Sequence, residues 1–313
     1  MTRAFVFPGQ GSQAVGMGKP LADAFASARE VFEEVDEALR QKLSALMFAG
    51  PDTELVLTAN TQPALMAVSV AVIRVLEREF RIDLSGVASH VAGHSLGEYS
   101  ALAAAGALDL ADAARLLRLR GEAMQKAVPV GDGAMAALLG LDLAVAQEVA
   151  REAAGNDVCD CANDNAPGQV VVSGARAAVE RAVEIAKAKG AKRAVMLQVS
   201  APFHCALMRP AADAMAEALA AAAIAPPRVP LVANVTAAPT SDPAEIRDLL
   251  VRQVTGLVRW RESVSAMKAL GVDVLVECGA GKVLTGLAKR IEPEMAATAI
   301  GAPAEIEAFA KSL

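Results

Sequence analysis

Residues 87–105 read VASHVAGHSLGEYSALAAA. An apolar run, 87–92, is followed by the turn 93–97, Gly-His-Ser-Leu-Gly, and then by a helical stretch, 98–105. The small residues around Ser95 allow a sharp turn between strand and helix, which leaves the hydroxyl exposed at the positive end of the helix. This pattern predicts a nucleophile elbow. A simple glycine turn between a strand and a helix is the alternative.

Other apolar runs of strand length alternate with amphipathic helical stretches along the chain. This alternation predicts a parallel sheet with helices on both faces. The expected strands are 4–7, 87–92, 231–235, 272–276 and 297–300, and the expected helices include 62–80 and 206–222.

The middle of the chain breaks this rhythm. Residues 133–199 show the order strand, helix, strand, strand, helix, strand, which is typical of a ferredoxin-like arrangement with its own antiparallel sheet. Turn-rich segments lie at both ends of this region. We therefore predict an α/β fold with a large subdomain, residues 1–130 and 200–313, and an inserted ferredoxin-like (βαββαβ) small subdomain, residues 131–199.

Composition argues against several classes of protein. The formal net charge is −6 and no long basic run is present, which argues against a nucleic-acid binder. No unbroken apolar stretch of about twenty residues is available to span a bilayer, and the N-terminal apolar run is too short for a signal peptide. The four cysteines lack metal-ligand spacing and fit free thiols. We expect a cytoplasmic monomer that needs no metal or cofactor.

One local basic cluster surrounds Gly190. Its members are Lys187, Lys189, Lys192 and Arg193. Cations are favoured at the C-terminus of a helix by the macrodipole, which is a structural explanation. The alternative is a docking patch for an acidic partner.

Ser95 requires a general base, because a serine hydroxyl is a poor nucleophile at neutral pH. The chain has only three histidines. His94 adjoins Ser95 and should point away from it, and His90 lies further back on the strand. His204 follows the inserted region and is therefore predicted as the base. No acid between the elbow and His204 has a clear motif context, so a backbone carbonyl or a side-chain amide is an alternative orienting group.

The first loop, residues 7–13, follows the first strand and is expected at the same edge of the sheet as the elbow. Two backbone amides there are candidates for an oxyanion hole, that of Leu96 and one from Gly9-Gln10-Gly11. A phosphate-binding loop is the alternative, but the loop has neither a third glycine nor a lysine.

Five motifs follow one another along the chain: GQGSQ (9–13), GHSLGEY (93–99), RG with MQ (120–125), NAPGQ (165–169) and PFH (202–204). Their order and spacing resemble those of the malonyl-CoA:acyl-carrier-protein transacylases over essentially the whole chain. The resemblance implies an α/β-hydrolase-like large subdomain with an inserted ferredoxin-like one. It also implies an acyltransferase that moves the malonyl group of malonyl-CoA to the phosphopantetheine thiol of acyl carrier protein by a ping-pong mechanism, for fatty acid biosynthesis.

Position by position, the resemblance implies Ser95 as the nucleophile and His204 as the base. It implies the backbone amides of Gln10 and Leu96 as the oxyanion donors. Arg120 corresponds to the arginine that holds the malonyl carboxylate, a task suited to a planar and permanently charged group.

Three further positions carry weaker implications. Gln253 matches the position whose backbone carbonyl orients the histidine. Asn163 and Asn165 lie near the cleft-lining asparagine segment of the family, and the sequence leaves open which of them faces the substrate. Without the resemblance, Arg120 would be assigned to a solvated helix face.

Three alternatives to this function stay open at this stage. The first is an esterase or thioesterase, against which Arg120 counts, because an arginine suits a dicarboxylic acyl group and not a fatty chain. The second is a silent carrier-binding module, which has no need of Ser95, His204 and the first loop. The third is a transacylase of a polyketide or malonate decarboxylase pathway, where Phe203 resembles the malonyl-selecting pattern.

Overall fold

A computed structural model describes all 313 residues of the chain. Its main sheet has six strands in the order β10-β9-β1-β2-β7-β8. All neighbouring pairs are parallel except the edge pair β7 and β8. The strands are β1 (Arg3–Phe7), β2 (His90–Gly93), β7 (Leu231–Val232), β8 (Pro239–Thr240), β9 (Val274–Cys278) and β10 (Ala296–Ile300).

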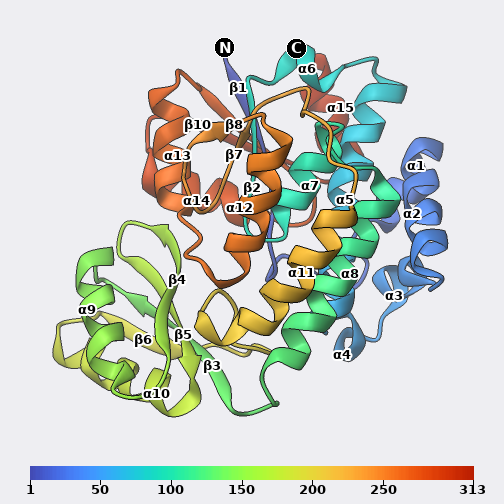
Figure 1. Cartoon of the computed structure of the whole chain (residues 1–313). Helices are drawn as coiled ribbons and strands as arrows, with labels where there is room; N and C mark the ends of the chain where they lie inside the picture. Colours follow the sequence, from blue (N-terminus) through green and yellow to red (C-terminus); the bar gives the residue numbers. More distant parts are fainter.

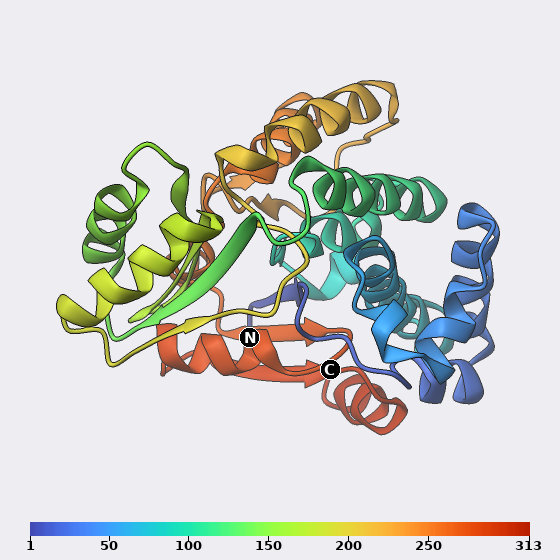
Figure 2. The same cartoon turned by 90° about the horizontal axis from the view of Figure 1, so that it is seen from below.

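Helices cover both faces of this sheet (Figures 1 and 2). The alternation along β1 shows the two faces, because Phe5 and Phe7 belong to one apolar cluster and Ala4 and Val6 to another. The helices of the main layer set are α1 (Lys19–Ala24), α2 (Ala26–Leu39), α3 (Leu43–Ala49), α4 (Asp52–Leu55), α5 (Thr58–Glu79), α6 (Leu84–Val87), α7 (Gly97–Ala104), α8 (Leu110–Ala127), the short 3₁₀ helix Ala206–Met208, α11 (Arg209–Ala221), α12 (Pro243–Thr255), α13 (Trp260–Ala269), α14 (Val283–Ile291) and α15 (Pro303–Lys311).

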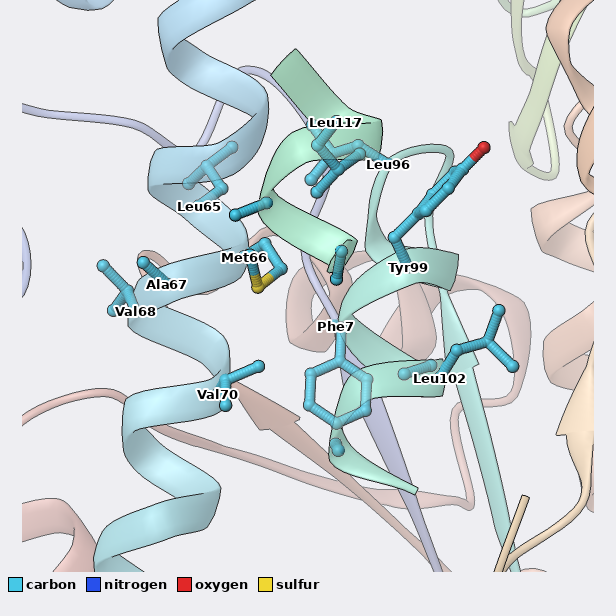
Figure 3. Close-up of a cluster of buried hydrophobic side chains, with 14 of the residues drawn as sticks. Phe7, Leu65, Met66, Ala67, Val68, Val70, Leu96, Tyr99, Leu102 and Leu117 are labelled. Atoms are coloured by element: carbon cyan, nitrogen blue, oxygen red, sulfur yellow. The ribbon is translucent and has the colours of Figure 1, made fainter. Parts of the chain in front are cut away.

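The central helix of the larger apolar cluster is α5. Its length of 22 residues and mean hydropathy of 1.3 would suffice to cross a membrane, but 89 % of its apolar stretch is buried inside the protein. Figure 3 shows side chains of α5, among them Leu65 and Met66, gathered with Phe7, Leu96 and Leu117. Leu96, the residue that follows Ser95, is therefore anchored in the core.

The second sheet is antiparallel and has four strands in the order β4-β5-β3-β6. Two helices pack against each other and against the sheet, and enclose a separate apolar cluster. Alternate residues on the other face, Met135 and Val171, belong instead to the main cluster. The elements are β3 (Gly133–Leu139), α9 (Leu143–Ala154), β4 (Cys159–Ala166), β5 (Gln169–Ala175), α10 (Arg176–Ala188) and β6 (Arg193–Met196).

The structure confirms the α/β class, with a mostly parallel sheet and a separate antiparallel one (Figure 1). The observed order of elements in the second sheet is β-α-β-β-α-β. The limits of the inserted subdomain, residues 131–199, and the likeness to hydrolase and ferredoxin folds stay predictions. The strand expected at 87–92 begins only at His90, because α6 extends to Val87.

A short backbone ladder fastens β4 of the second sheet to the segment between α12 and α13. The amide of Asp164 donates to the carbonyl of Val258 at 2.9 Å, and the amide of Val258 donates to the carbonyl of Ala162 at 2.9 Å. An ion pair of 2.8 Å joins Asp164 to Arg261. This attachment holds Asn163, on β4, at the junction of the two sheets.

Candidate active site

Ser95 occupies the turn between β2 and α7 with a positive φ of 54°. A side chain at position 93 is impossible without movement, because its Cβ would lie 1.9 Å from the carbonyl carbon of Gly97. A Cβ at position 97 would lie 2.3 Å from the carbonyl oxygen of Phe7. Asn234 spans the turn: Oδ1 accepts from the Ser95 amide at 2.8 Å, and Nδ2 donates to the Gly93 carbonyl at 2.7 Å. The glycine pattern is therefore required by close backbone approach.

The hydroxyl of Ser95 is hydrogen-bonded to His204, with 2.7 Å between Oγ and Nε2. The other ring nitrogen, Nδ1, donates to the backbone carbonyl of Gln253 at 2.8 Å, which sets Nε2 as the acceptor. Burial and, to a smaller extent, the nearby charge of Arg120 lower the pKa of His204 from 6.5 to about 3. His204 is therefore neutral at physiological pH, with its free lone pair directed at the Ser95 hydroxyl.

The backbone amides of Gln10 and Leu96 lie in the two loops that leave β1 and β2. These strands are parallel and Phe7 pairs with Gly93, so both loops emerge at one edge of the sheet. Neither amide donates a hydrogen bond to another backbone group. The side chain of Gln10 is held by Thr58, whose hydroxyl donates to Oε1 at 2.6 Å. Both amides remain available to an oxygen atom of a ligand.

Arg120 is not on a solvated helix face. It lies on α8 and is 1 % exposed. Nη1 donates to Oε1 of Gln62 at 2.8 Å, and Nη2 donates to Oε1 of Gln253 at 2.8 Å and to Oγ of Ser95 at 3.2 Å. The Nε–H group has no partner, and no carboxylate forms an ion pair with the guanidinium. A buried cation held by neutral amides is suited to an anionic ligand.

A cleft of about 200 Å³ opens above Ser95 between the two sheets. Met135 and Val171 of the small sheet and Phe203 supply apolar wall. Asn163 and Asn165 line it as well, together with the serine, histidine, arginine and Gln10 described above. The structure therefore brings residues from the first 124 positions, from the second sheet and from the segment after β6 together around the Ser95 hydroxyl.

The other two histidines are engaged elsewhere. His94 bonds through Nε2 to Oδ1 of Asn165 at 2.8 Å, and His90 bonds through Nδ1 to the hydroxyl of Ser89 at 3.0 Å. Oδ1 of Asn165 is thus occupied by His94, while its Nδ2 and the side chain of Asn163 form no hydrogen bond within the protein, and both residues line the cleft.

Three residues of the site had no role in the sequence analysis. Gln62 holds Arg120, Asn234 braces the turn, and Glu98 bonds to both Asn234 and Gln253. Glu98 lies inside the GHSLGEY motif, so its place beside the elbow was visible. Asn234 and Gln62 belong to no motif and become apparent only through long-range contacts.

Acidic side chains of α9 and α10 partly neutralise the basic cluster. Lys187 pairs with Glu184 at 2.7 Å, and Lys189 pairs with Glu152 at 3.1 Å. The other two members of the cluster are exposed and form no ion pair. The structural explanation therefore accounts for half of the cluster.

Comparison with known proteins connects this geometry to a family. Residues 4–297 match the family model of the acyl transferase domain. The malonyl CoA-acyl carrier protein transacylase of Escherichia coli K12 is 50 % identical over 306 residues, which cover 97 % of each chain. That of Bacillus subtilis strain 168 is 46 % identical over 313 residues, 99 % of this chain and 96 % of the relative.

Solved structures agree. An acyl-carrier-protein S-malonyltransferase from Bartonella henselae is 57 % identical and superposes with a TM-score of 0.97 over 100 % of this chain and 99 % of the other. A malonyl-transacylase solved in complex with a type II PKS acyl carrier protein has a TM-score of 0.96 at 45 % identity, with 100 % of both chains covered. This chain belongs to the malonyl CoA-acyl carrier protein transacylase family.

Proposed function

We propose that this protein transfers the malonyl group of malonyl-CoA to the phosphopantetheine thiol of acyl carrier protein, through an ester on Ser95, for fatty acid biosynthesis. One observation carries the proposal. The Ser95 hydroxyl is already hydrogen-bonded to a neutral histidine. It lies 3.2 Å from Nη2 of Arg120, a buried guanidinium that forms no ion pair. A nucleophile beside a carboxylate receptor fits an acyl donor that ends in a carboxylate.

In the first half-reaction Ser95 Oγ attacks the thioester carbonyl carbon of malonyl-CoA. The hydroxyl proton passes to Nε2 of His204 as the oxygen–carbon bond forms. The negative charge moves to the carbonyl oxygen, where the backbone amides of Gln10 and Leu96 donate to it. The carbon–sulfur bond then breaks, the coenzyme A sulfur takes the proton from His204, and a malonyl ester remains on Ser95.

In the second half-reaction the phosphopantetheine thiol attacks the same ester carbonyl. His204 accepts the thiol proton, the amides again hold the oxyanion, and the carbon–oxygen bond to Ser95 breaks. The proton returns to Ser95 Oγ, and malonyl-carrier protein leaves. The two thiols use the cleft in turn, as a ping-pong sequence requires.

Arg120 has two tasks in this scheme. Its guanidinium binds the malonyl carboxylate by charge-assisted hydrogen bonds, while Gln62 and Gln253 hold the group in place. A neutral acyl group leaves the buried cation without a counter-charge, which disfavours acetyl transfer. The arginine thus supplies the preference for a carboxylated acyl group.

The partners follow from the same chemistry. Relatives are named for malonyl-CoA and acyl carrier protein, and one solved relative holds a carrier protein. We propose the same two partners here, a cytoplasmic location in keeping with four free thiols, and a monomer as the active unit. Lys192 and Arg193 are proposed as part of the docking surface, because acyl carrier proteins are acidic.

The direct test is the intact mass of the protein after brief mixing with malonyl-CoA. A malonyl adduct that is absent from Ser95→Ala and moves to added holo-acyl carrier protein is the expected result. An adduct that water removes equally fast with and without carrier protein would identify a hydrolase instead. No adduct at all would favour a binding module.

A further inference from the structure

Glu98 is a buried carboxyl group that the proposed mechanism does not use. It follows the elbow in α7 and is 1 % exposed. Burial raises the pKa of Glu98 to about 8, while bonds from Asn234 and Gln253 and the charge of Arg120 act in the opposite direction. A buried acid beside a reactive serine calls for a functional explanation.

Two N–H groups from different elements hold this carboxyl group. Oε1 accepts from the backbone amide of Asn234 at 2.7 Å, and Oε2 accepts from Nε2 of Gln253. Both donor residues also contact Ser95: Asn234 accepts from its amide at 2.8 Å, and Gln253 donates to its carbonyl at 2.9 Å. Glu98 therefore braces the two residues that brace the elbow.

Glu98 also helps to hold the Gln253 side-chain amide in place. A guanidinium only donates hydrogen bonds, so the amide oxygen of Gln253 faces Arg120, and its NH₂ group is left to the Ser95 carbonyl and to Oε2 of Glu98. The amide oxygen accepts from Nη2 of Arg120 at 2.8 Å. One amide thus separates the buried acid from the buried guanidinium.

We propose that Glu98 is a positioning residue that determines selectivity for a carboxylated acyl group, because it helps to hold in place the Gln253 amide that holds Arg120 in the cleft. The inference rests on the proposed function, in which Arg120 binds the malonyl carboxylate. His204 is held by the backbone carbonyl of Gln253 and not by its side chain. Acyl transfer as such therefore depends on Glu98 less than malonyl selection does.

The variant Glu98→Gln keeps the volume and removes one acceptor. Its single oxygen stays with the Asn234 amide, so its NH₂ group meets the NH₂ group of Gln253. The NH₂ group of Gln253 then loses its acceptor on Glu98 and meets a second donor, which displaces the amide and weakens the bond between its oxygen and Arg120. We expect kcat/KM for malonyl-CoA to fall by on the order of tenfold to a hundredfold, the scale for an unsatisfied buried polar group, and kcat/KM for acetyl-CoA to fall much less.

The matched control is Glu277→Gln. Glu277, on β9, is also 1 % exposed and accepts from the amides of Leu284 and Thr285 at 3.0 and 2.7 Å. It caps the start of α14 and does not line the cleft. This variant should lower the melting temperature and leave the malonyl-to-acetyl ratio unchanged.

A double-mutant cycle separates selection from general stability. The ratio of Ser95 acylation rates with malonyl-CoA and acetyl-CoA is measured for Glu98→Gln with Arg120 present and with Arg120→Ala. We expect Glu98→Gln to change the ratio only when Arg120 is present, because coupled residues are not additive. Equal losses with both donors, or the same change of ratio without Arg120, would overturn the proposal.

A swap variant covers the case in which Glu98→Gln does not fold. Glu98→Gln with Gln253→Glu keeps one acid and one amide in the same space, but the carboxylate then faces Arg120 directly. We expect a folded protein that has lost its malonyl preference, and an unchanged preference would contradict the inference. Wild-type protein that forms no malonyl adduct would overturn the proposed function itself, independently of these variants.

Discussion

The Nδ1 atom of His204 lies 2.8 Å from the backbone carbonyl oxygen of Gln253. In a serine-histidine-aspartate triad a carboxylate takes this place. The carbonyl fixes the same tautomer and ring orientation, but it brings no full negative charge to stabilise an imidazolium. The base is therefore oriented as in a triad while its charged form is left without a counter-ion.

This relationship predicts the acid limb of the pH profile. Burial and the charge of Arg120 lower the pKa of His204 from an ordinary 6.5 to about 3, so the base stays unprotonated as the pH falls below 6.5. We expect kcat/KM for Ser95 acylation to hold down to pH values well below 6.5. Acetyl-CoA is the substrate of choice, because its acyl group does not titrate. An acid limb with a midpoint near 6.5 would contradict the pKa shift.

Arg120→Ala should impair malonyl transfer selectively. Loss of the charge-assisted hydrogen bonds to a carboxylate is expected to lower kcat/KM for malonyl-CoA by roughly a hundredfold, with a much smaller effect on acetyl-CoA. Arg118→Ala is the matched control, because Arg118 lies two positions earlier on α8 and bonds to Asn60 at 2.9 Å, outside the cleft. Equal losses with both acyl donors would remove Arg120 from the acyl pocket.

Gly93→Ala should destabilise the elbow. The new Cβ would meet the backbone of Gly97 at 1.9 Å, and no side-chain movement can relieve a contact between two backbone segments. We expect a loss of unfolding free energy of roughly 3 kcal/mol or more, measured by urea denaturation. Gly286→Ala on α14 meets nothing within 4 Å and should stabilise by up to about 1 kcal/mol. Similar effects of the two substitutions would show that close approach does not explain Gly93.

Reversing the unpaired half of the basic cluster should weaken carrier binding. With Lys192→Glu and Arg193→Glu combined, we expect KM for holo-acyl carrier protein to rise and KM for malonyl-CoA to stay unchanged. The rise should shrink at high ionic strength, because exposed charges are screened. Lys289→Glu combined with Lys311→Glu, on α14 and α15, is the control with the same change in net charge. An unchanged carrier KM would leave only the structural explanation of the cluster.

Local patterns in the sequence were sufficient for much of the fold and for the reactive pair. The glycine pattern around Ser95 reports a close approach within one turn, and strand and helix periods report burial within one element. His204 was predicted as the base by elimination among the three histidines. The start of the strand before the elbow was misjudged, because an apolar run does not distinguish the last residues of α6 from an extended chain.

The remaining residues needed the resemblance or the structure. Arg120 lies in a helical stretch beside Arg115 and Arg118, where charge alone indicates a solvated face. Its burial results from packing α8 against α5 and from acceptors on Gln62 and Gln253, which are 58 and 133 positions away. Such contacts leave no periodic signal in the sequence.

The sequence by itself determined the glycine turn around Ser95, the order of the elements and the choice of His204 as the proposed base. The first two depend on neighbours within a few positions, and the third on the small number of histidines. Only the tertiary structure decided which carbonyl orients His204, how His94 engages Asn165, and how Glu98 is connected to Arg120. Those relationships join residues from separate elements, and Asn234 lies 139 positions from the amide that it holds. Their geometry exists only once both sheets and the helices between them have packed.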